Sequence, residues 1–460
     1  MAGADCLLGT VETMRRSGNR KPCTQRWQNP GGKTTRVITT RVRLTPIGAP
    51  LNLRERTTGT RLAWKHWPIV GDVWARGLSI GANTTAMGAL VSVILPTFNR
   101  AHCVGQAIDS ALKQTHRDLE VIVVDDGSTD ETLHLIKAKY GKLKSIRYIY
   151  QENRGVAVAR NTALREAQGE FIAFLDSDDV WRPWKIELQL ACMEKLPHIG
   201  MIWTDMEAVG PDGTITDRQY LRKMYAAYRR FSTEKSFTER HDLPAISTQL
   251  DAELTRGALY GGDIFSPMVT GNLVHTSTAL LRRDRAERVN GFNEEFHIAG
   301  EDYDFHLRTC REGPVGFIDL ATIRYQTGMP DQLVRRSYWM AEGFLKTVTA
   351  TLETDGDRIT LPPGMINEVL AEANTWLAET LISRCEPRKA SGYLLRSLCH
   401  KPWQPRAFAQ LILCQLPFAL AEACRGAYRF VRHRGPSVLT AHLLGDQLVS
   451  GADALNLAVY

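Results

Sequence analysis

Hydrophobic positions in the middle of the chain alternate between short continuous runs and helical spacing. Residues 90–96 (LVSVILP) and 119–126 (LEVIVVDD) are continuous runs rich in β-branched residues, which is typical of parallel strands that are covered on both faces. Between them, apolar residues recur at helical spacing over residues 101–116. The pattern therefore predicts a βαβ unit, and the same alternation continues to about residue 325.

Two more strands and two more helices follow in the same order. Residues 146–152 and 170–176 (EFIAFLD) read as strands, and residues 128–141 and 155–169 read as helices. Ser128 and Glu131 stand three apart at the start of the first of these helices, which predicts a capping box there. Together the elements predict an open, mostly parallel α/β sheet. Such sheets bind ligands beyond the carboxyl ends of their strands.

The pattern divides the chain into four parts. Residues 1–86 have no sustained apolar period, so we expect a basic, loosely ordered extension, and Met87 leaves open whether it belongs to the native protein. Residues 87–330 form the predicted α/β domain. Residues 331–432 are predicted to be a helical C-terminal region, and residues 433–460 give little signal. Within the helical region, the apolar segment 407–424 carries polar residues and a proline, so it is predicted to be amphipathic rather than membrane-spanning.

Composition and charge narrow the class of protein. The 460 residues carry a formal charge of +7, but residues 1–86 account for +10 and the rest of the chain for −3. The body of the protein therefore lacks the basic balance of a nucleic-acid-binding protein, which argues against nucleic acid as a partner. The nine cysteines include no CxxC pair, which argues against a zinc site and a disulfide framework. The first residues contain no secretory signal pattern, so we expect a cytoplasmic protein.

Carboxylates follow the predicted strands. Asp176 and Asp178 are two apart in extended chain, so their side chains project to the same side. Such a pair suits Mg²⁺ or Mn²⁺ that also binds water and a diphosphate, although the same spacing occurs in acidic turns, and this alternative stays open. Asp125 and Asp126 end an earlier strand on opposite faces, so only one can face the crevice and accept bonds from a base or a ribose.

Other candidates lie outside the strand ends. Glu301 and Asp302 begin a predicted helix, where a carboxylate could act as a general base or merely complement the helix dipole. Arg160 could reach a phosphate. His275, on an apparent strand, could face an acceptor pocket or belong to the core, and Trp181 could stack on a sugar or pack inside the domain.

Five segments in order, VSVILPTFNR, LEVIVVDDGSTDET, NRGVAVARN, GEFIAFLDSDDVW and GEDYDF, resemble the family 2 glycosyltransferases of GT-A fold over residues 90–330. The resemblance implies a mostly parallel open sheet flanked by helices, to which the C-terminal helical region is appended. It also implies transfer of a sugar from a nucleotide-sugar donor to an acceptor hydroxyl, with inversion at the anomeric carbon.

The resemblance also implies roles for individual residues. Asp178 would be the direct metal ligand, Asp176 would lie nearer the ribose or sugar and share the cation site, and Asp179 would be a structural neighbour. Asp302 would be the base, flanked by Glu301. The predicted nucleotide-sugar contacts, besides Asp176 and Arg160, are Pro96, Thr97 and Phe98 around the nucleobase and Asp126 on the base itself.

The chain departs from the family pattern at one place. Many relatives carry an Arg-x-His segment after the base region, whose His helps to hold the cation or the diphosphate. Here the corresponding stretch, residues 323–336, reads IRYQTGMPDQLVRR, and Gln326 stands close to the expected position of that His. The sequence therefore leaves open which group completes the cation site.

The sequence predicts an inverting, metal-dependent glycosyltransferase of glycan, polysaccharide or glycolipid assembly. Its acceptor could be a glycan, a lipid-linked sugar or a protein, and the basic extension and the segment 407–424 suggest peripheral contact with the inner face of a membrane. Two alternatives are a nucleotidyltransferase, which would be expected to carry a glycine-rich phosphate loop after the first strand, and a non-catalytic scaffold that binds nucleotide-sugars.

Overall fold

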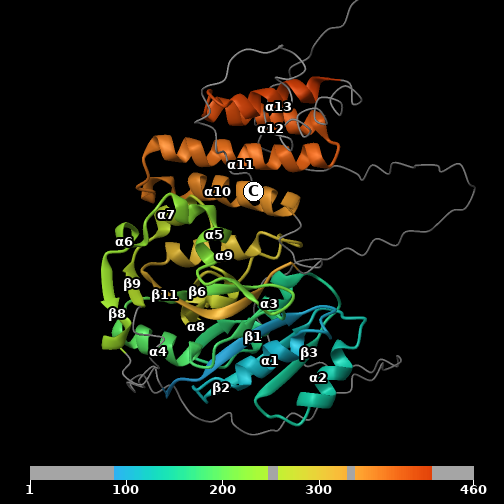
Figure 1. Ribbon diagram of the computed structural model, residues 1–460, viewed down its shortest axis with the longest axis vertical. Coiled ribbons are helices and arrows are strands. Elements are labelled where there is room, and N and C mark those ends of the chain that lie inside the picture. The colour runs from blue at the N-terminus through green and yellow to red at the C-terminus, as the bar shows by residue number, and fades with distance from the viewer. Residues whose placement is uncertain (1–87, 247–256, 329–336, 417–460) are drawn as a thin grey trace, which may run out of the picture. The chain divides into compact units, whose positions relative to one another are not determined.

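The computed structural model describes residues 88–246, 257–328 and 337–416 (Figure 1). The basic extension, residues 1–86, the tail, residues 433–460, and the second part of the amphipathic segment, residues 417–424, lie outside the described residues. No helix among the described residues is long and apolar enough to cross a membrane.

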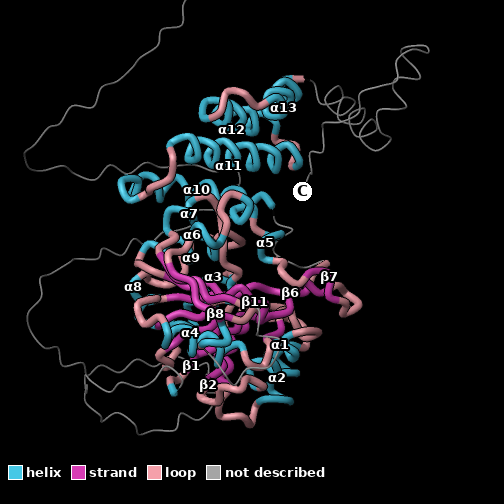
Figure 2. The backbone as a smooth tube through the Cα atoms, turned by 60° about the vertical axis from the view of Figure 1, so that its left-hand side comes forward, coloured by secondary structure: helices cyan, strands magenta, loops and turns pink. Residues whose placement is uncertain are grey.

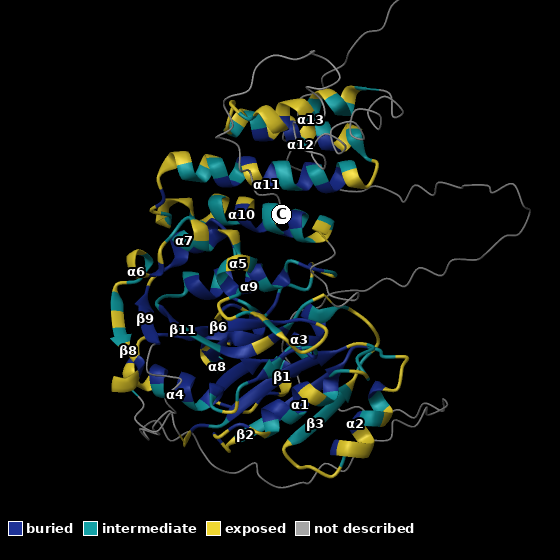
Figure 3. Cartoon of the chain, viewed as in Figure 1, coloured by how far each residue is buried: buried dark blue, intermediate teal, exposed yellow. Residues whose placement is uncertain are grey.

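The first half of the domain is the predicted run of strands and helices. In chain order its elements are β1 (Val91–Thr97), α1 (Val104–Leu112), β2 (Leu119–Asp125), α2 (Thr132–Tyr140), β3 (Ile146–Tyr150), α3 (Val156–Glu166) and β4 (Phe171–Phe174). β1 lies between β2 and β4 and is parallel to both, so that Val91 stands opposite Leu119 on one side and Phe171 on the other. Every residue of β1 and β4 is buried, as the continuous apolar runs predict (Figure 3).

The second half adds strands on the other side of β4. Its strands are β5 (Val180–Trp181), β6 (Met201–Val209), β7 (Ile215–Asp217), β8 (Glu239–Asp242), β9 (Ala258–Gly262), β10 (Leu280–Arg282) and β11 (Val315–Gln326). Its helices and turns are α4 (Lys185–Lys195), α5 (Leu221–Met224), η2 (Ala226–Arg229), α6 (Thr233–Ser236), η3 (Leu243–Ala245), α7 (Phe265–Val269), η5 (Thr276–Thr278), α8 (Arg283–Arg288) and α9 (Glu301–Arg311).

Within the described residues all the strands form one mixed sheet. The order is β3-β2-β1-β4-β10-β6-β11-β9-β8, with β5 beside β11 and β7 beside β6. β1 to β4, β6 and β11 run in one direction, and the three-residue strand β10 lies antiparallel between β4 and β6. The predicted fold class, a mostly parallel sheet flanked by helices, is confirmed.

A series of helices follows the sheet (Figure 2). They are α10 (Ser337–Asp355), the turn η7 (Gly356–Arg358), α11 (Pro363–Ser383), α12 (Pro387–His400) and α13 (Pro405–Gln415). The predicted helical appendage is thus present. α10 packs on α9, and a Cβ added to Gly300 before α9 would meet the Cα of Gly343 in α10 at 3.1 Å. The two backbones can lie this close because neither residue has a side chain.

Two local predictions are wrong. Ser128 and Glu131 form no capping box, because α2 begins only at Thr132 and the side chain of Asp130 accepts the Thr132 N–H instead. The Ser128 hydroxyl accepts the N–H of Asn99 in the neighbouring loop. His275 does not lie on a strand but directly before η5, in the connection between α7 and β10.

Candidate active site

The loops after β1 and β2 are held together at one edge of the sheet. Asn99 has a positive φ of 53°, and its Oδ1 accepts the N–H groups of Thr129 and Asp130 at 2.8 and 3.3 Å. The Asp126 N–H donates to the carbonyl of Thr97 at 2.9 Å. Two of the predicted strand ends therefore form one continuous surface, as expected where neighbouring parallel strands end together.

Asp125 and Asp126 have different surroundings, as their alternation along the strand predicts. Asp125 is fully buried and accepts the Tyr148 hydroxyl at 2.6 Å, which makes it part of the core. Asp126 accepts the N–H groups of Arg154 and Gly155 at 3.0 and 2.8 Å. Its carboxylate thus fixes the loop before α3 beside the end of β2.

The expected nucleobase residues lie at the end of β1. Pro96 is buried within the strand, and Thr97 is buried with its hydroxyl oxygen unpaired among the described residues. The side chain of Phe98 is 45% exposed directly after them. An exposed ring at a strand end is available for stacking on a planar ligand.

Arg160 joins two parts of the site that are far apart in the sequence. Its Nη2 donates to Asp176 and its Nη1 to Glu301, each at 2.8 Å. Burial would raise the pKa of Asp176, but the charges of Arg160 and His275 outweigh it and lower that pKa. The sequence suggested a phosphate contact for Arg160, whereas in the structure carboxylates occupy both of these nitrogens.

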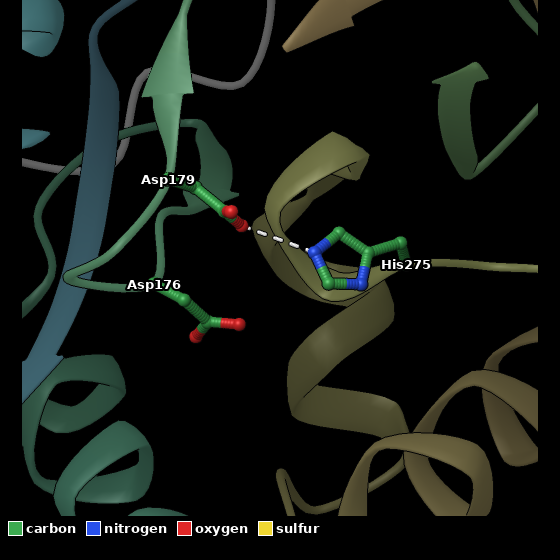
Figure 4. A group of neighbouring side chains, drawn as sticks. All are labelled: Asp176, Asp179 and His275. Atoms are coloured by element: carbon green, nitrogen blue, oxygen red, sulfur yellow. Dashed lines mark hydrogen bonds and ion pairs between the residues drawn. The ribbon is translucent and has the colours of Figure 1, made fainter. Parts of the chain in front are cut away.

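The turn after β4 places the three aspartates of DSDD in different surroundings, and Figure 4 shows two of them, Asp176 and Asp179. Asp178 is 3.8 Å from Arg100. Asp179 is buried and lies 3.0 Å from Nε2 of His275. One ligand atom from each of Asp176, Asp179 and His275 lies within 4.8 Å of the others. The sequence did not predict this pairing of Asp179 and His275, because the two residues are far apart in the chain and neither stands in a spaced motif with the other.

Charge and burial shift the pKa values of this cluster. Burial, and then the charges of Asp179 and Asp176, raise the pKa of Asp178 to about 6. Burial opposes ionisation of His275, but the hydrogen bond and the charge of Asp179 raise its pKa overall. The turn is therefore an acidic corner that favours positive charge beside it.

The turn η5 before β10 is hydrogen-bonded to the acidic turn after β4. The backbone N–H of Asp176 donates to Ser277 Oγ at 2.9 Å, and the indole N–H of Trp181 donates to the Ser277 carbonyl at 3.0 Å. Trp181 is only 3% exposed and lies against the amine of Lys185. The structure therefore favours the packing role of Trp181 over a sugar-stacking face.

α9 begins beside the same cluster. Gly300 precedes it with a φ of 101°, and Asp302 accepts the side-chain N–H of Asn272 at 3.3 Å. Burial raises the pKa of Asp302 even though the charges of Arg160 and His275 lower it. Burial also raises the pKa of Glu301 to about 7, against the effect of Arg160. The start of α9 thus holds two carboxyl groups that are less acidic than usual.

The end of β11 carries no histidine, as the sequence indicates. Gln326 donates from its side chain to the carbonyl of Gly210 at 3.0 Å. The preceding residue, Tyr325, meets the ring of His275 edge-on, with the ring centres 5.1 Å apart. The strand that would carry the family's late His thus contacts a histidine from another element.

Comparison with known proteins identifies the domain. Residues 92–248 match the model of the family described as "Glycosyl transferase family 2". An uncharacterized glycosyltransferase of Rickettsia felis is 47% identical over 118 residues, which is 25% of this chain and 19% of that protein. The chondroitin synthase of Escherichia coli is 36% identical over 137 residues, 30% of this chain and 20% of that protein. The putative teichuronic acid biosynthesis glycosyltransferase TuaG of Bacillus subtilis is 42% identical over 131 residues, 28% of this chain and 51% of that protein. The matches thus span about half or less of these relatives.

Two solved structures are similar at low identity. The structure of S. aureus TarS in complex with UDP-GlcNAc gives a TM-score of 0.40 at 19% identity, over 71% of this chain and 89% of that one. The mannosyltransferase PcManGT from Pyrobaculum calidifontis, in complex with GDP-Man and Mn²⁺, gives a TM-score of 0.42 at 18% identity, over 77% of this chain and 85% of that one.

The mixed sheet with an acidic site at its strand ends, together with the sequence relatives, defines a glycosyltransferase domain. Residues 92–248 carry the match to glycosyltransferase family 2, so this part of the chain is a domain of that family.

Proposed function

We propose that the protein is an inverting glycosyltransferase that moves a sugar from a nucleotide-sugar donor to an acceptor hydroxyl. The observation that carries the proposal is the Arg160 bridge. It brings the acidic turn after β4 and the start of α9 together, within a domain of family 2. The site then contains carboxylates that can bind a cation and a separate carboxylate that can accept a proton from the acceptor hydroxyl. The reaction requires both groups.

The donor nucleotide is proposed to lie over the ends of β1 and β2. The exposed ring of Phe98 offers a stacking surface for the base, beside Pro96 and Thr97. Asp126 already aligns the loop before α3 and is the proposed partner of the base. The sugar would then extend toward Asp176, because the turn after β4 follows a strand that pairs directly with β1.

Asp302 is proposed to take the proton from the acceptor hydroxyl. Its place on a helix fixes the carboxylate, and burial makes it a stronger base than an exposed aspartate. With this base beside the acceptor, the hydroxyl attacks the face opposite the leaving diphosphate, and a single displacement inverts the anomeric carbon. Glu301 holds Arg160 and thereby ties the base region to the donor region.

The acidic turn fits a divalent cation, Mg²⁺ or Mn²⁺. Asp179 Oδ1 is buried and accepts no hydrogen bond from the described residues, so the corner has more acceptor atoms than donors. Asp176 and Asp178 form a D-x-D pair (the DXD spacing), and they are the ligands that this spacing predicts. When bound, such a cation neutralises negative charge that develops on the departing diphosphate.

Relatives that include chondroitin and hyaluronan synthases support an acceptor in glycan or polysaccharide assembly, with a lipid-linked or protein acceptor as the other possibilities. The alternatives from the sequence, a nucleotidyltransferase and a non-catalytic scaffold, gain no specific support from the site.

A screen of nucleotide-sugars by thermal unfolding, with and without Mn²⁺, tests the proposal. We expect one donor to raise the unfolding temperature most, and to do so only with the cation, because a ligand that binds the native state stabilises it. NMR of the transfer product should then show an inverted anomeric centre. A retained configuration, or no response to any nucleotide-sugar, would contradict the proposal.

We also propose that the protein works on the cytoplasmic side of a membrane that it contacts peripherally. α13 supports this, since Phe408 and Ile412, one helical turn apart, are 57% and 52% exposed, and Trp403 before the helix is 86% exposed. Liposomes with anionic lipid should therefore carry the protein upward in a flotation gradient. Replacing both Phe408 and Ile412 with Ser should abolish this, and equal flotation of the variant would contradict the assignment of α13.

A further inference from the structure

We propose that His275 and Asp179, together with Asp176, are the protein ligands of the divalent cation. The inference rests on the proposed function and goes beyond it, because neither the DXD spacing nor the family resemblance gives His275 or Asp179 this role. In many relatives a histidine near the position of Gln326 helps to hold the cation, and here His275 would take over that role.

The three side chains converge from two separate parts of the chain (Figure 4). Asp176 and Asp179 come from the turn after β4, and His275 comes from the connection before η5. Their ligand atoms lie within 4.8 Å of one another. A cation between them would need only small side-chain movements to reach the two carboxylates and the imidazole nitrogen.

One buried carboxylate oxygen of the acidic turn has no hydrogen-bond partner among the described residues. Asp179 is 1% exposed; its Oδ2 is bound by His275, and the side chain of Ser277 also stabilises its charged form. Its Oδ1 is buried without a hydrogen-bond partner among the described residues. A buried carboxylate oxygen without a partner is energetically costly, and a bound cation would remove that cost. The hydrogen bond to His275 alone does not satisfy this oxygen.

Asp178 is placed differently. Its side chain is 21% exposed and lies 3.8 Å from Arg100, on the β1 side of the turn, and it is not part of the converging group. The DXD spacing assigns the cation to Asp176 and Asp178. In the structure, Asp176 converges with Asp179 and His275 instead, so Asp179 replaces Asp178 as the second carboxylate ligand.

The ligands are held in place by their surroundings. Ser277 binds the backbone N–H of Asp176 and thereby fixes the η5 turn to the acidic turn. The ring of Tyr325 meets His275 edge-on and limits its rotation. Residue Tyr325 of β11 thus orients the imidazole of His275, although β11 carries no histidine of its own at Gln326. Such support from outside the ligand set orients metal-binding side chains.

The ligand set also predicts which cation is preferred. Mg²⁺ is bound almost entirely by oxygen in near-ideal octahedral geometry, whereas first-row transition metals, of which Mn²⁺ is the weakest binder, accept an imidazole nitrogen more readily. We therefore expect the protein to bind Mn²⁺ more tightly than Mg²⁺. Competition of Mg²⁺ against bound Mn²⁺ measures this preference directly.

Electron paramagnetic resonance of Mn²⁺ added to the full-length protein provides the test, without any sugar substrate. We expect electron spin echo modulation from a directly bound ¹⁴N, and a change in that modulation when histidine is labelled with ¹⁵N. His275→Gln should remove the modulation and weaken Mn²⁺ binding by at least about tenfold, as should Asp179→Asn for affinity alone. Asp178→Asn should weaken Mn²⁺ binding clearly less than Asp179→Asn does, and it should leave the modulation in place.

A matched control uses His198, a partly exposed histidine that pairs with Glu239. His198→Gln should leave both the modulation and the affinity unchanged. Loss of binding in Asp178→Asn with retained binding in Asp179→Asn would overturn the proposal. So would Mn²⁺ bound to the wild-type protein without nitrogen modulation, a result that requires no variant to fold. A nitrogen-bound Mn²⁺ in a protein that transfers no sugar would instead overturn the proposed function and leave this site intact.

Discussion

Replacing Asp302 with Asn is expected to lower kcat by about 10²–10⁴-fold, which is the usual contribution of a general base. The amide keeps the size of the side chain and can still contact Asn272, but it cannot accept the acceptor's proton. Binding of the preferred nucleotide-sugar should be nearly unchanged, because the proposed donor contacts lie on β1, β2 and the acidic turn. Steady-state kinetics and a thermal-shift titration of the donor measure the two effects separately.

Asp304 on the same helix is the matched control. It pairs with Arg308 one turn further along α9, so Asp304→Asn removes a carboxylate without touching the proposed base. Unchanged turnover in Asp302→Asn would contradict the assignment. The wild-type pH profile gives a second measure, because the base must be ionised to act. Burial raises the pKa of Asp302. As the pH is lowered, kcat/KM should therefore begin to fall at a higher pH than it would with an exposed aspartate as the base.

Replacing Arg160 with Met is expected to lower the free energy of unfolding by about 3–5 kcal/mol, the cost of leaving buried charges without their partner. Arg160 is 3% exposed and binds both Asp176 and Glu301. In the variant these two carboxylates would face each other without a cation between them. Urea denaturation measures the loss, and the variant should also bind the donor poorly.

The pH dependence of this loss has a definite sign. Arg160 helps to lower the pKa of Asp176, so the stability that Asp176 contributes exists above its ordinary pKa and disappears as the pH falls. The difference between wild type and Arg160→Met should therefore shrink toward acidic pH. Arg165→Met, on the exposed side of the same helix, should cost less than about 1 kcal/mol. Equal stability of the two variants would show that the bridge is not a buried ion pair.

The sequence predicts the strands of the first half of the sheet because their signal is local. Continuous β-branched runs such as residues 91–97 can be buried on both faces only in a covered parallel sheet, and the structure has them there. The strand β10 gives no such signal, since it has only three residues and lies antiparallel between β4 and β6. Its position depends on tertiary pairing, and with it the position of His275.

The candidate site divides in the same way. Motifs within a few residues, such as DSDD and GEDYDF, could be recognised from spacing and resemblance. The bridge from Arg160 to Glu301 joins residues 141 apart, and the contact of Asp179 with His275 joins residues 96 apart. Neither pairing follows from periodicity, because each depends on which loops the folded sheet brings together. The sequence thus predicts most of the candidate site residues, but it does not predict which of them pair in the folded protein.

The contact between Gly300 and Gly343 bears on how short a fragment of this protein can keep the proposed activity. The family match ends at residue 248, and the recognisable motifs end in α9. Yet Gly300, two residues before the proposed base, lies against the backbone of α10, where a Cβ on Gly343 would come within 3.2 Å of Gly300. A fragment cut after β11 would contain all the motifs recognised in the sequence and still lack the helix that packs against the start of α9. For recombinant expression, the helical region through at least α10 should therefore be kept together with the glycosyltransferase domain.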